Sequence, residues 1–461
     1  MAIFLIVSAT FGSGFYQIGS HFRTNLVFSS LTLIFNATAT YISCRYYSQL
    51  LKAARLGSIQ EIVYYYGGGR EGIICVSFLM MLVFATNTTF VIDFLNRQIE
   101  IMCYFVFAPN DPPTQNLIKT VTLFSCGVLL YPFCLIKNFH KIKLLGFGLF
   151  ILEQLILIYM LFACWYGGEL IIDKQFENPF IWDANAPWLN MVPFSRIFSL
   201  QGFFMIIYGY LEERSKINEG TGVTKGQRAA RVYGWSTIII MVNAFMYGIC
   251  DSIELYLDRK MKYIWDLIFV GAGFFMILIQ IPFKFYMTKE FLFVLYDELK
   301  NKGLSSKIED LREYSTCEGQ QMHYSKLQVK KLRDDLYQIV RMPFLKFTKR
   351  EYITLTSCTY VATVGLMIIV NGILPIGEDE VKLTRWHWEV LTLTCAMIEP
   401  IITFVIPGYY YYKMSKKEDL NNPIARFGAL AFAFLGVLIS VFYTGTSLFR
   451  MTNMDIWIFI N

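Results

Sequence analysis

Two carboxyl groups stand inside long apolar runs, where acidic side chains are rare. Glu153 lies in the middle of ILEQLIL, and Glu399 directly precedes Pro400 in another apolar run. An ionised carboxylate in hydrocarbon costs at least about 2.5 kcal/mol unless it is paired, so Glu153 is expected to be neutral or paired. It is a candidate for proton coupling, with a structural hydrogen bond as the alternative. Because proline interrupts a helix, Glu399 and Pro400 predict either a gating kink or a packing kink.

Two segments with glycine could expose backbone groups to a ligand. The sequence FGSGF at 11–15 can unwind and offer N–H groups to an anion, or it can form a small-residue packing face. The sequence FSLQGF at 198–203 carries a glutamine and a glycine in the middle of a short apolar run. The candidate substrate-binding residues are Phe11, Gly12, Ser13, Gly14, Ser199, Leu200, Gln201 and Gly202.

The elements that must position these residues are membrane-spanning helices. The chain is 55% hydrophobic and only 16% charged, whereas soluble domains carry about 25% charged residues. The apolar residues form blocks long enough to cross a bilayer as helices. The sequence predicts about eleven spans, near 2–20, 26–44, 72–94, 118–136, 142–165, 196–211, 233–251, 264–287, 352–375, 388–412 and 425–448.

Charge orients the predicted bundle. The loops after the even-numbered spans carry most of the Lys and Arg, which places them and the N-terminus on the cytosolic side or its topological equivalent. The longest of these loops, 290–350, is polar, and its segment 327–340 is expected to form an amphipathic surface helix. The only glycosylation sequons, at Asn36 and Asn87, fall inside spans. Their position favours an organelle membrane over the cell surface.

Several functional classes have no support in the sequence. The cysteines and histidines show no spacing typical of a metal site or a disulfide framework, so free buried thiols are expected. There is no P-loop, dinucleotide fingerprint or nucleophile elbow, and neither an enzyme nor a cofactor is predicted. The net charge of +6 follows the orientation of the loops and does not indicate a nucleic-acid partner.

Interrupted helices at spans 1 and 6 predict a particular architecture. An eleven-span chain with this pattern matches two inverted five-helix repeats whose broken helices meet at a midplane substrate site. The first repeat is expected over 1–165 and the second over 196–412, with the polar inner loop 290–350 inside it. The segment 425–448 is the eleventh helix. Secondary transport is therefore the leading hypothesis.

Several stretches resemble the amino acid/auxin permease family. They are GSGFYQIGSHF from Gly12, SIQEIVYYYGGGR from Ser58, FSLQGFFMIIYGYLEERSK from Phe198, and the pair IQIPFKFYMTKEF and FVIPGYYYYKMSKKE. They look like the family's opening glycine motif, the stretch after span 2, the span-6 pattern and the exits of spans 8 and 10. The resemblance implies an all-α LeuT-type fold, a small amino acid as substrate, and coupling to a proton or a sodium ion.

A second hypothesis is a transport-inactive accessory subunit of a larger membrane complex, with a mitochondrial membrane as its candidate location. Gly19 and Tyr208 stand where the family has proline, and Gln201 stands where its proton-coupled branch has glutamate. A site released from transport fits these departures. In that case 327–340 and the C-terminal MTNMDIWIFIN are expected to be contact surfaces for other subunits.

Overall fold

The chain is an all-helical integral membrane protein. The computed structural model describes residues 2–10, 18, 22, 26–54, 58–107, 112–137, 139–166, 192–198, 225–254, 263–309, 346–373, 378–417 and 423–452. Within these residues, eight helices are long and apolar enough to cross a membrane, and a shorter apolar helix runs over Gly146–Phe162. The predicted spans at these nine places are confirmed. The predicted spans 2–20 and 196–211 lie partly outside the described residues.

The helices follow the apolar blocks of the sequence closely. Their bounds are α1 (Ala2–Thr10), α3 (Leu26–Ala54), α4 (Ile59–Val63), α5 (Gly69–Phe107), α6 (Pro112–Cys134), α7 (Phe139–Tyr166), α8 (Val192–Ile197), α10 (Lys225–Glu254), α11 (Tyr263–Asn301), α14 (Lys349–Tyr360), α15 (Leu366–Ile373), α16 (Glu378–Pro400), α17 (Ile406–Lys417) and α18 (Pro423–Thr452). Three π-helical turns join neighbouring helices: η1 (Tyr64–Gly68), η4 (Val361–Gly365) and η5 (Ile401–Val405).

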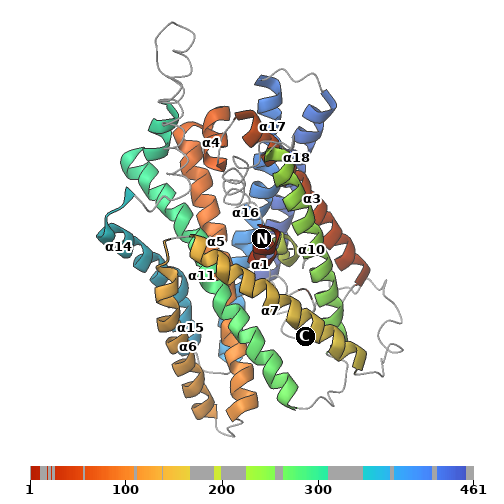
Figure 1. Ribbon diagram of the computed structural model, residues 1–461, viewed down its shortest axis with the longest axis vertical. Helices are drawn as coiled ribbons and strands as arrows, with labels where there is room; N and C mark the ends of the chain where they lie inside the picture. Colours follow the sequence, from red (N-terminus) through yellow and green to blue (C-terminus); the bar gives the residue numbers. More distant parts are fainter. Residues whose placement is uncertain are drawn as a thin grey trace.

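The centre of the bundle is the pair α5 and α11, which pack against each other along much of their length. Around this pair, α3 packs on α10 and α6 packs on α15. The short helix α1 lies about halfway along the bundle and contacts α7, α10 and α11, while α7 crosses α11 obliquely (Figure 1). Helices far apart in the sequence therefore enclose one interior, and α1 reaches into it.

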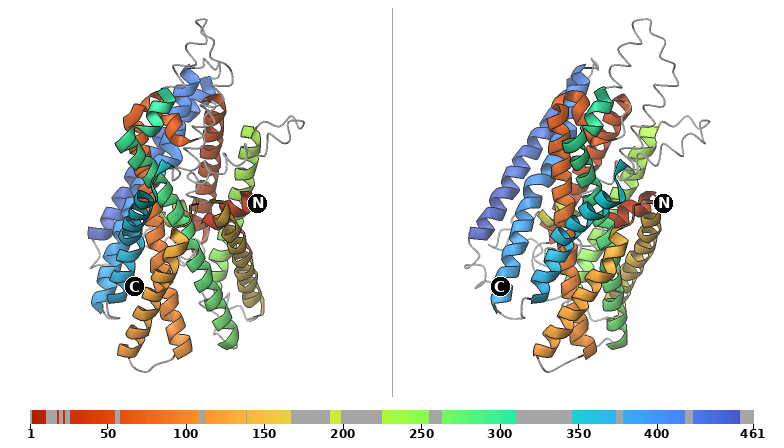
Figure 2. Two further views of the ribbon diagram at one scale, coloured as in Figure 1. Left: turned by 60° about the vertical axis from the view of Figure 1, so that its left-hand side comes forward. Right: turned by 90° about the vertical axis from the view of Figure 1, so that its left-hand side faces the viewer.

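The last helix lies at the edge of the bundle. Figure 2 shows α18 on the outside, and it packs on α16, α17 and η5. Its other side exposes large apolar side chains such as Ile424 and Phe427, which are 83% and 75% exposed. In water such a face would be unfavourable, whereas in a bilayer it contacts lipid tails. The eight cysteines whose side chains the structure describes are free; six of them are buried, while Cys75 and Cys358 are exposed.

The polar stretch predicted from residue 290 begins as helix. Helix α11 continues to Asn301, and a further helical turn covers 303–309. The continuation is possible because its charged residues find partners: Glu298 is fully buried and accepts the backbone N–H groups of Leu304 and Ser305 at 3.0 and 3.1 Å. The predicted amphipathic segment 327–340 and the C-terminal residues 453–461 lie outside the described residues.

Candidate functional site

Both predicted intramembrane acids are deeply buried. Glu153 of α7 is fully buried, and neither of its carboxylate oxygens has a hydrogen-bond partner among the described residues. Glu399 near the end of α16 is 3% exposed and accepts a hydrogen bond from Ser195 Oγ of α8 at 2.6 Å. One acid is thus held by a neighbouring helix, while the other lies in the interior without a hydrogen bond within the described part of the chain.

A buried arginine lies next to Glu399. Arg196 of α8 is 4% exposed, and its Nη2 donates to Thr392 Oγ1 of α16 at 2.9 Å. Its guanidinium carbon also lies 3.7 Å from the ring centroid of Phe90 on α5, which is a close cation–π contact. These contacts fix the guanidinium between α5, α8 and α16, one residue from the serine that holds Glu399.

Lys284 completes the group from α11. It is 6% exposed and interacts electrostatically with both carboxyl groups, those of Glu399 and Glu153, and with the guanidinium of Arg196. Four ionisable side chains from α7, α8, α11 and α16 therefore share one buried region, here called the polar centre: Glu153, Arg196, Lys284 and Glu399. Two are acids and two are bases, so their formal charges cancel.

The polar centre is sensitive to a change in charge because hydrocarbon does not solvate charged groups. Each charge depends on the others for compensation, and a change in one protonation state alters the balance for all. A bound zwitterion or a transferred proton would therefore shift the energies of the helices that carry these residues. Among the described residues, no three His, Cys, Asp or Glu side chains gather in a way that could hold a metal ion.

The helix that carries Glu399 changes its hydrogen bonding directly after Pro400. In η5 the N–H of Ile406 donates to the carbonyl of Ile401, five residues back. The carbonyl of Ile402 would need the N–H of residue 407, which is a proline and has none. Instead it accepts a hydrogen bond from the hydroxyl of Tyr47 on α3 at 2.8 Å. Pro407 thus leaves the carbonyl of Ile402 without a backbone donor, and Tyr47 from another helix supplies one.

The helix that carries Arg196 ends close to the predicted interruption of span 6. Helix α8 stops at Ile197, and the N–H of Phe198 donates to the carbonyl of Ser195 at 3.1 Å, which tightens the last turn. The carbonyl of Phe198 accepts a long hydrogen bond, 3.4 Å, from Thr40 Oγ1 on α3. A side chain of another span therefore serves as a partner for this helix end.

The structure places only some of the predicted site residues. Glu153, Glu399 and Pro400 are described, and Lys284 brings the two acids into one electrostatic group. The predicted substrate-binding residues lie outside the described residues: Phe11, Gly12, Ser13, Gly14, Ser199, Leu200, Gln201 and Gly202. Helix α1 ends at Thr10, next to the first of them.

Sequence reasoning missed three polar residues of the interior. Lys284 had a visible signal, because it stands inside the apolar run of α11, whereas Arg196 lies near the end of the short helix α8 and had no such signal. Asp93 lies one residue before the predicted end of the third span at 94, and that end is too early. Because α5 continues to Phe107, Asp93 is buried, and its carboxylate accepts a hydrogen bond from Asn371 at 2.9 Å.

Comparison with known proteins gives little further information. No protein family matches this sequence, and no curated protein matches it. Among solved structures, the chain is similar in shape to mutant forms of the manganese transporter of Eremococcus coleocola. The sequence identity is 11%, with 98% of this chain and 94% of the transporter covered and TM-scores of 0.35 to 0.38. A likeness this distant says nothing about what this chain binds.

Proposed function

We propose that this chain is a secondary carrier for a small amino acid. The observation that carries the proposal is the polar centre, in which two acids and two bases from four helices are buried with balanced charge. Ionisable residues inside a membrane protein mark substrate or ion pathways more often than packing. A zwitterion adds one charge of each sign and leaves such a balance intact, whereas a purely anionic or cationic substrate would upset it.

The packing of the helices supports the inverted-repeat architecture. Counted along the predicted spans, α3, α5 and α6 are spans 2, 3 and 4, and α10, α11 and α15 belong to spans 7, 8 and 9. Each helix of the first set packs on the helix five spans later. Two intertwined five-helix repeats would produce this pattern, with the substrate at the interface between them. The substrate carboxylate would then meet the N–H groups around 12–14, and its ammonium the carbonyls around 199–200.

Proton coupling through Glu153 fits the same geometry. Helix α1 packs on α7, which carries Glu153, so the state of this carboxyl group affects the helix that precedes the substrate segment. Lys284 already supplies a positive charge next to Glu153. A sodium ion needs several oxygen ligands, whereas a proton binds to a single carboxylate oxygen. We therefore favour a proton over sodium as the driving ion.

Uptake into proteoliposomes tests the carrier. Purified protein would be reconstituted with an imposed proton gradient and offered a mixture of labelled amino acids, with Lys284→Gln as the matched variant. We expect gradient-dependent uptake by the native protein and a loss of uptake in the variant. If folded native protein takes up none of the amino acids under proton or sodium gradients, the carrier proposal fails.

A second candidate is the transport-inactive accessory subunit, and one observation favours it. Two side chains of the polar centre are held by neighbouring residues: Ser195 holds Glu399, and Arg196 is fixed by Thr392 and Phe90. Side chains fixed in this way can also seal a former pathway. This candidate predicts that mild detergent releases the chain in an assembly much larger than its own 53.5 kDa. Recovery as a monomer would contradict it and leave the carrier.

A further inference from the structure

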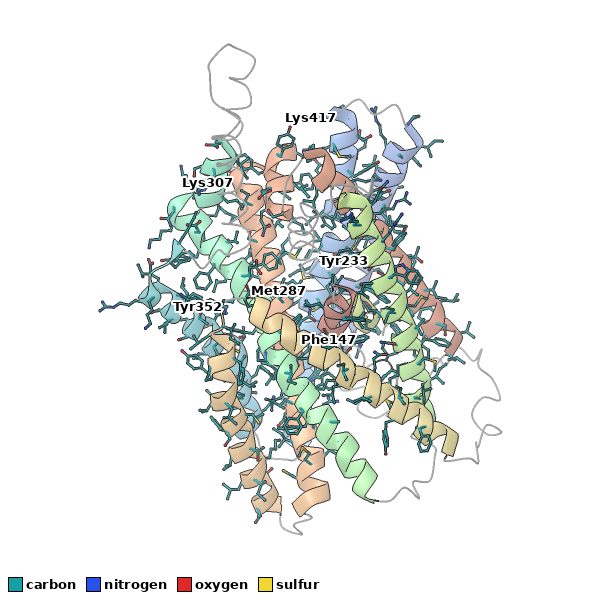
Figure 3. The ribbon with its side chains drawn as sticks, viewed as in Figure 1. Phe147, Tyr233, Met287, Lys307, Tyr352 and Lys417 are labelled. Carbon is teal, nitrogen blue, oxygen red and sulfur yellow. The ribbon has the colours of Figure 1, made fainter. Side chains whose placement is uncertain are left out.

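An open pocket of about 480 Å³, here called the cavity, lies at the end of the bundle where α17 ends and α5 begins. Its lining comes from η1 and α17. Three consecutive tyrosines, Tyr64 to Tyr66, form one side with Gly67 and Gly69, and Lys413 and Lys417 form the other. Figure 3 shows Lys417 at this end of the bundle, the same end as Lys307. The cavity is separate from the polar centre and plays no part in the proposed carrier mechanism.

The backbone of η1 shapes the cavity. Gly67 has φ of 117° and Gly69 has φ of 55°, conformations that side chains disfavour. These two residues turn the chain between α4 and α5, and the rings of Tyr65 and Tyr66 before the turn lie next to Lys417 of α17. A Cβ atom added at Gly67 would lie 3.0 Å from Lys413 Nζ, so the ammonium group sits directly against the turn. The cavity is therefore built by the local sequence and is not a gap between straight helices.

The lining is positively charged. Lys417 Nζ lies 4.0 Å from the ring centroid of Tyr65, and Lys413 Nζ lies 4.8 Å from that of Tyr409. None of the lining residues that the structure describes is acidic. The hydroxyl of Tyr64 donates to Glu309 at 2.5 Å. Two ammonium groups without a carboxylate in the lining attract an anion, and the hydroxyl of Tyr65 can donate a further hydrogen bond to one of its oxygens.

The position of the cavity indicates which anion. Tyr409 to Tyr412 and the following lysines form the aromatic and basic flank typical of a membrane interface, on the side where the positively charged loops gather. Basic pockets between helices on that side suit the headgroups of anionic lipids. We propose that the cavity binds the phosphate group of an anionic phospholipid through Lys413 and Lys417. Phosphate is the chemistry that is recognised, and the interfacial position makes a lipid its source.

Thermal unfolding in nanodiscs tests the proposal with the full-length protein. Nanodiscs of phosphatidylcholine alone would be compared with nanodiscs that also contain phosphatidylglycerol, because a ligand that binds the folded state raises its unfolding temperature. We expect phosphatidylglycerol to stabilise the native protein and to co-purify with it. The Lys413→Gln, Lys417→Gln double variant should bind at least about tenfold more weakly and lose that stabilisation.

The control is Lys416→Gln, because Lys416 is exposed on the same helix and does not line the cavity. It should keep the lipid effect, and so should Lys413→Arg with Lys417→Arg, which retains both charges. If the double glutamine variant does not fold, Lys417→Gln alone replaces it. Protection by inorganic phosphate in phosphatidylcholine nanodiscs would show that the anion is free phosphate and overturn the lipid source. A double variant with the native lipid response, or a Lys416→Gln variant with an equal loss, would overturn the site.

Discussion

Helix α11 carries two buried lysines that interact with different kinds of groups. Lys289 is fully buried, and its ammonium donates to the carbonyls of Cys134 and Ile136 at 2.8 and 2.9 Å and to the hydroxyl of Tyr352 at 2.8 Å. Lys284 is almost as buried, but its electrostatic partners are the carboxyl groups of the polar centre. Five residues correspond to a rotation of about 140° around a helix, so the two ammonium groups point into different environments.

Lys289 has a structural role, whereas the surroundings of Lys284 can change during transport. Lys289 caps the C-terminal carbonyls of α6, groups that no helix can satisfy by itself and that favour a positive charge. The two backbone carbonyls cannot change protonation state, so these two hydrogen bonds depend on the fold alone. Lys284 faces groups that can gain a proton or bind to a substrate instead. Burial alone therefore does not mark a functional residue in this bundle; the chemistry of its partners does.

The largest expected effect is on stability, at the structural lysine. Lys289→Met keeps the length of the side chain but leaves two buried carbonyls and the Tyr352 hydroxyl without their donor. We expect a loss of about 3 kcal/mol in the free energy of unfolding, seen as a lower thermal unfolding midpoint in detergent. Lys300→Met is the control, because the Lys300 pair with Glu351 is largely exposed and should contribute little. Equal midpoints for Lys289→Met and the native protein would contradict the capping role.

At Lys284 we expect a substitution to reduce uptake more than stability. Lys284→Gln removes one of the two positive charges that balance Glu153 and Glu399, so we expect uptake to fall at least about tenfold while most of the protein still folds. Uptake and the thermal midpoint would be measured on the same preparation. The comparison fails if Lys284→Gln loses as much stability as Lys289→Met and keeps its uptake per folded molecule.

The sequence predicts the positions of the helices well and their contacts poorly. Apolar length alone locates α6 and α18, because a span must cross a fixed thickness of hydrocarbon. The predicted end of span 8 near 287 is too early, since Lys289 and Glu290 look like the start of a polar loop. Both remain in the helix, and Lys289 binds groups of α6 and α14, which lie far away in the sequence.

The polar centre could be predicted only one residue at a time. Glu153 and Glu399 stand out in apolar runs, and Lys284 is visible by the same criterion. Their meeting depends on how α7, α11 and α16 pack, and no local pattern reports that. Arg196 is harder to detect, because it lies in a short helix, where an arginine is easily taken for a charged residue at the end of a span. Its contact with Phe90 of α5 shows that it belongs to the interior.

A substitution at Glu153 in the polar centre tests whether this carboxyl group couples transport to a proton. Glu153→Gln keeps the shape of the side chain but cannot bind or release a proton. We expect uptake by the native protein to depend on pH and uptake by the variant to be nearly independent of it, with substrate binding retained. Binding would be followed by tryptophan fluorescence, and uptake across a series of pH values. An unchanged pH dependence in the variant would remove Glu153 from the coupling mechanism and leave it a buried structural acid.

The smallest effect on stability is expected at η5, the π-helical turn that follows Glu399. Tyr47→Phe removes the hydroxyl that donates to the carbonyl of Ile402 and changes nothing else in the side chain. A buried carbonyl without a donor costs about 1 to 2 kcal/mol, so the unfolding midpoint should fall by less than in Lys289→Met. If η5 serves as a gate, the rate of uptake should change as well, because the hydrogen bond ties α3 to the helix that carries Glu399.

Tyr46→Phe on α3 is the matched control for Tyr47→Phe, since Tyr46 packs on the rings of Tyr411 and Phe432. A loss of stability with an unchanged uptake rate would make the turn a packing feature, and the kink at Pro400 would then belong with Lys289 among the fixed parts of the bundle.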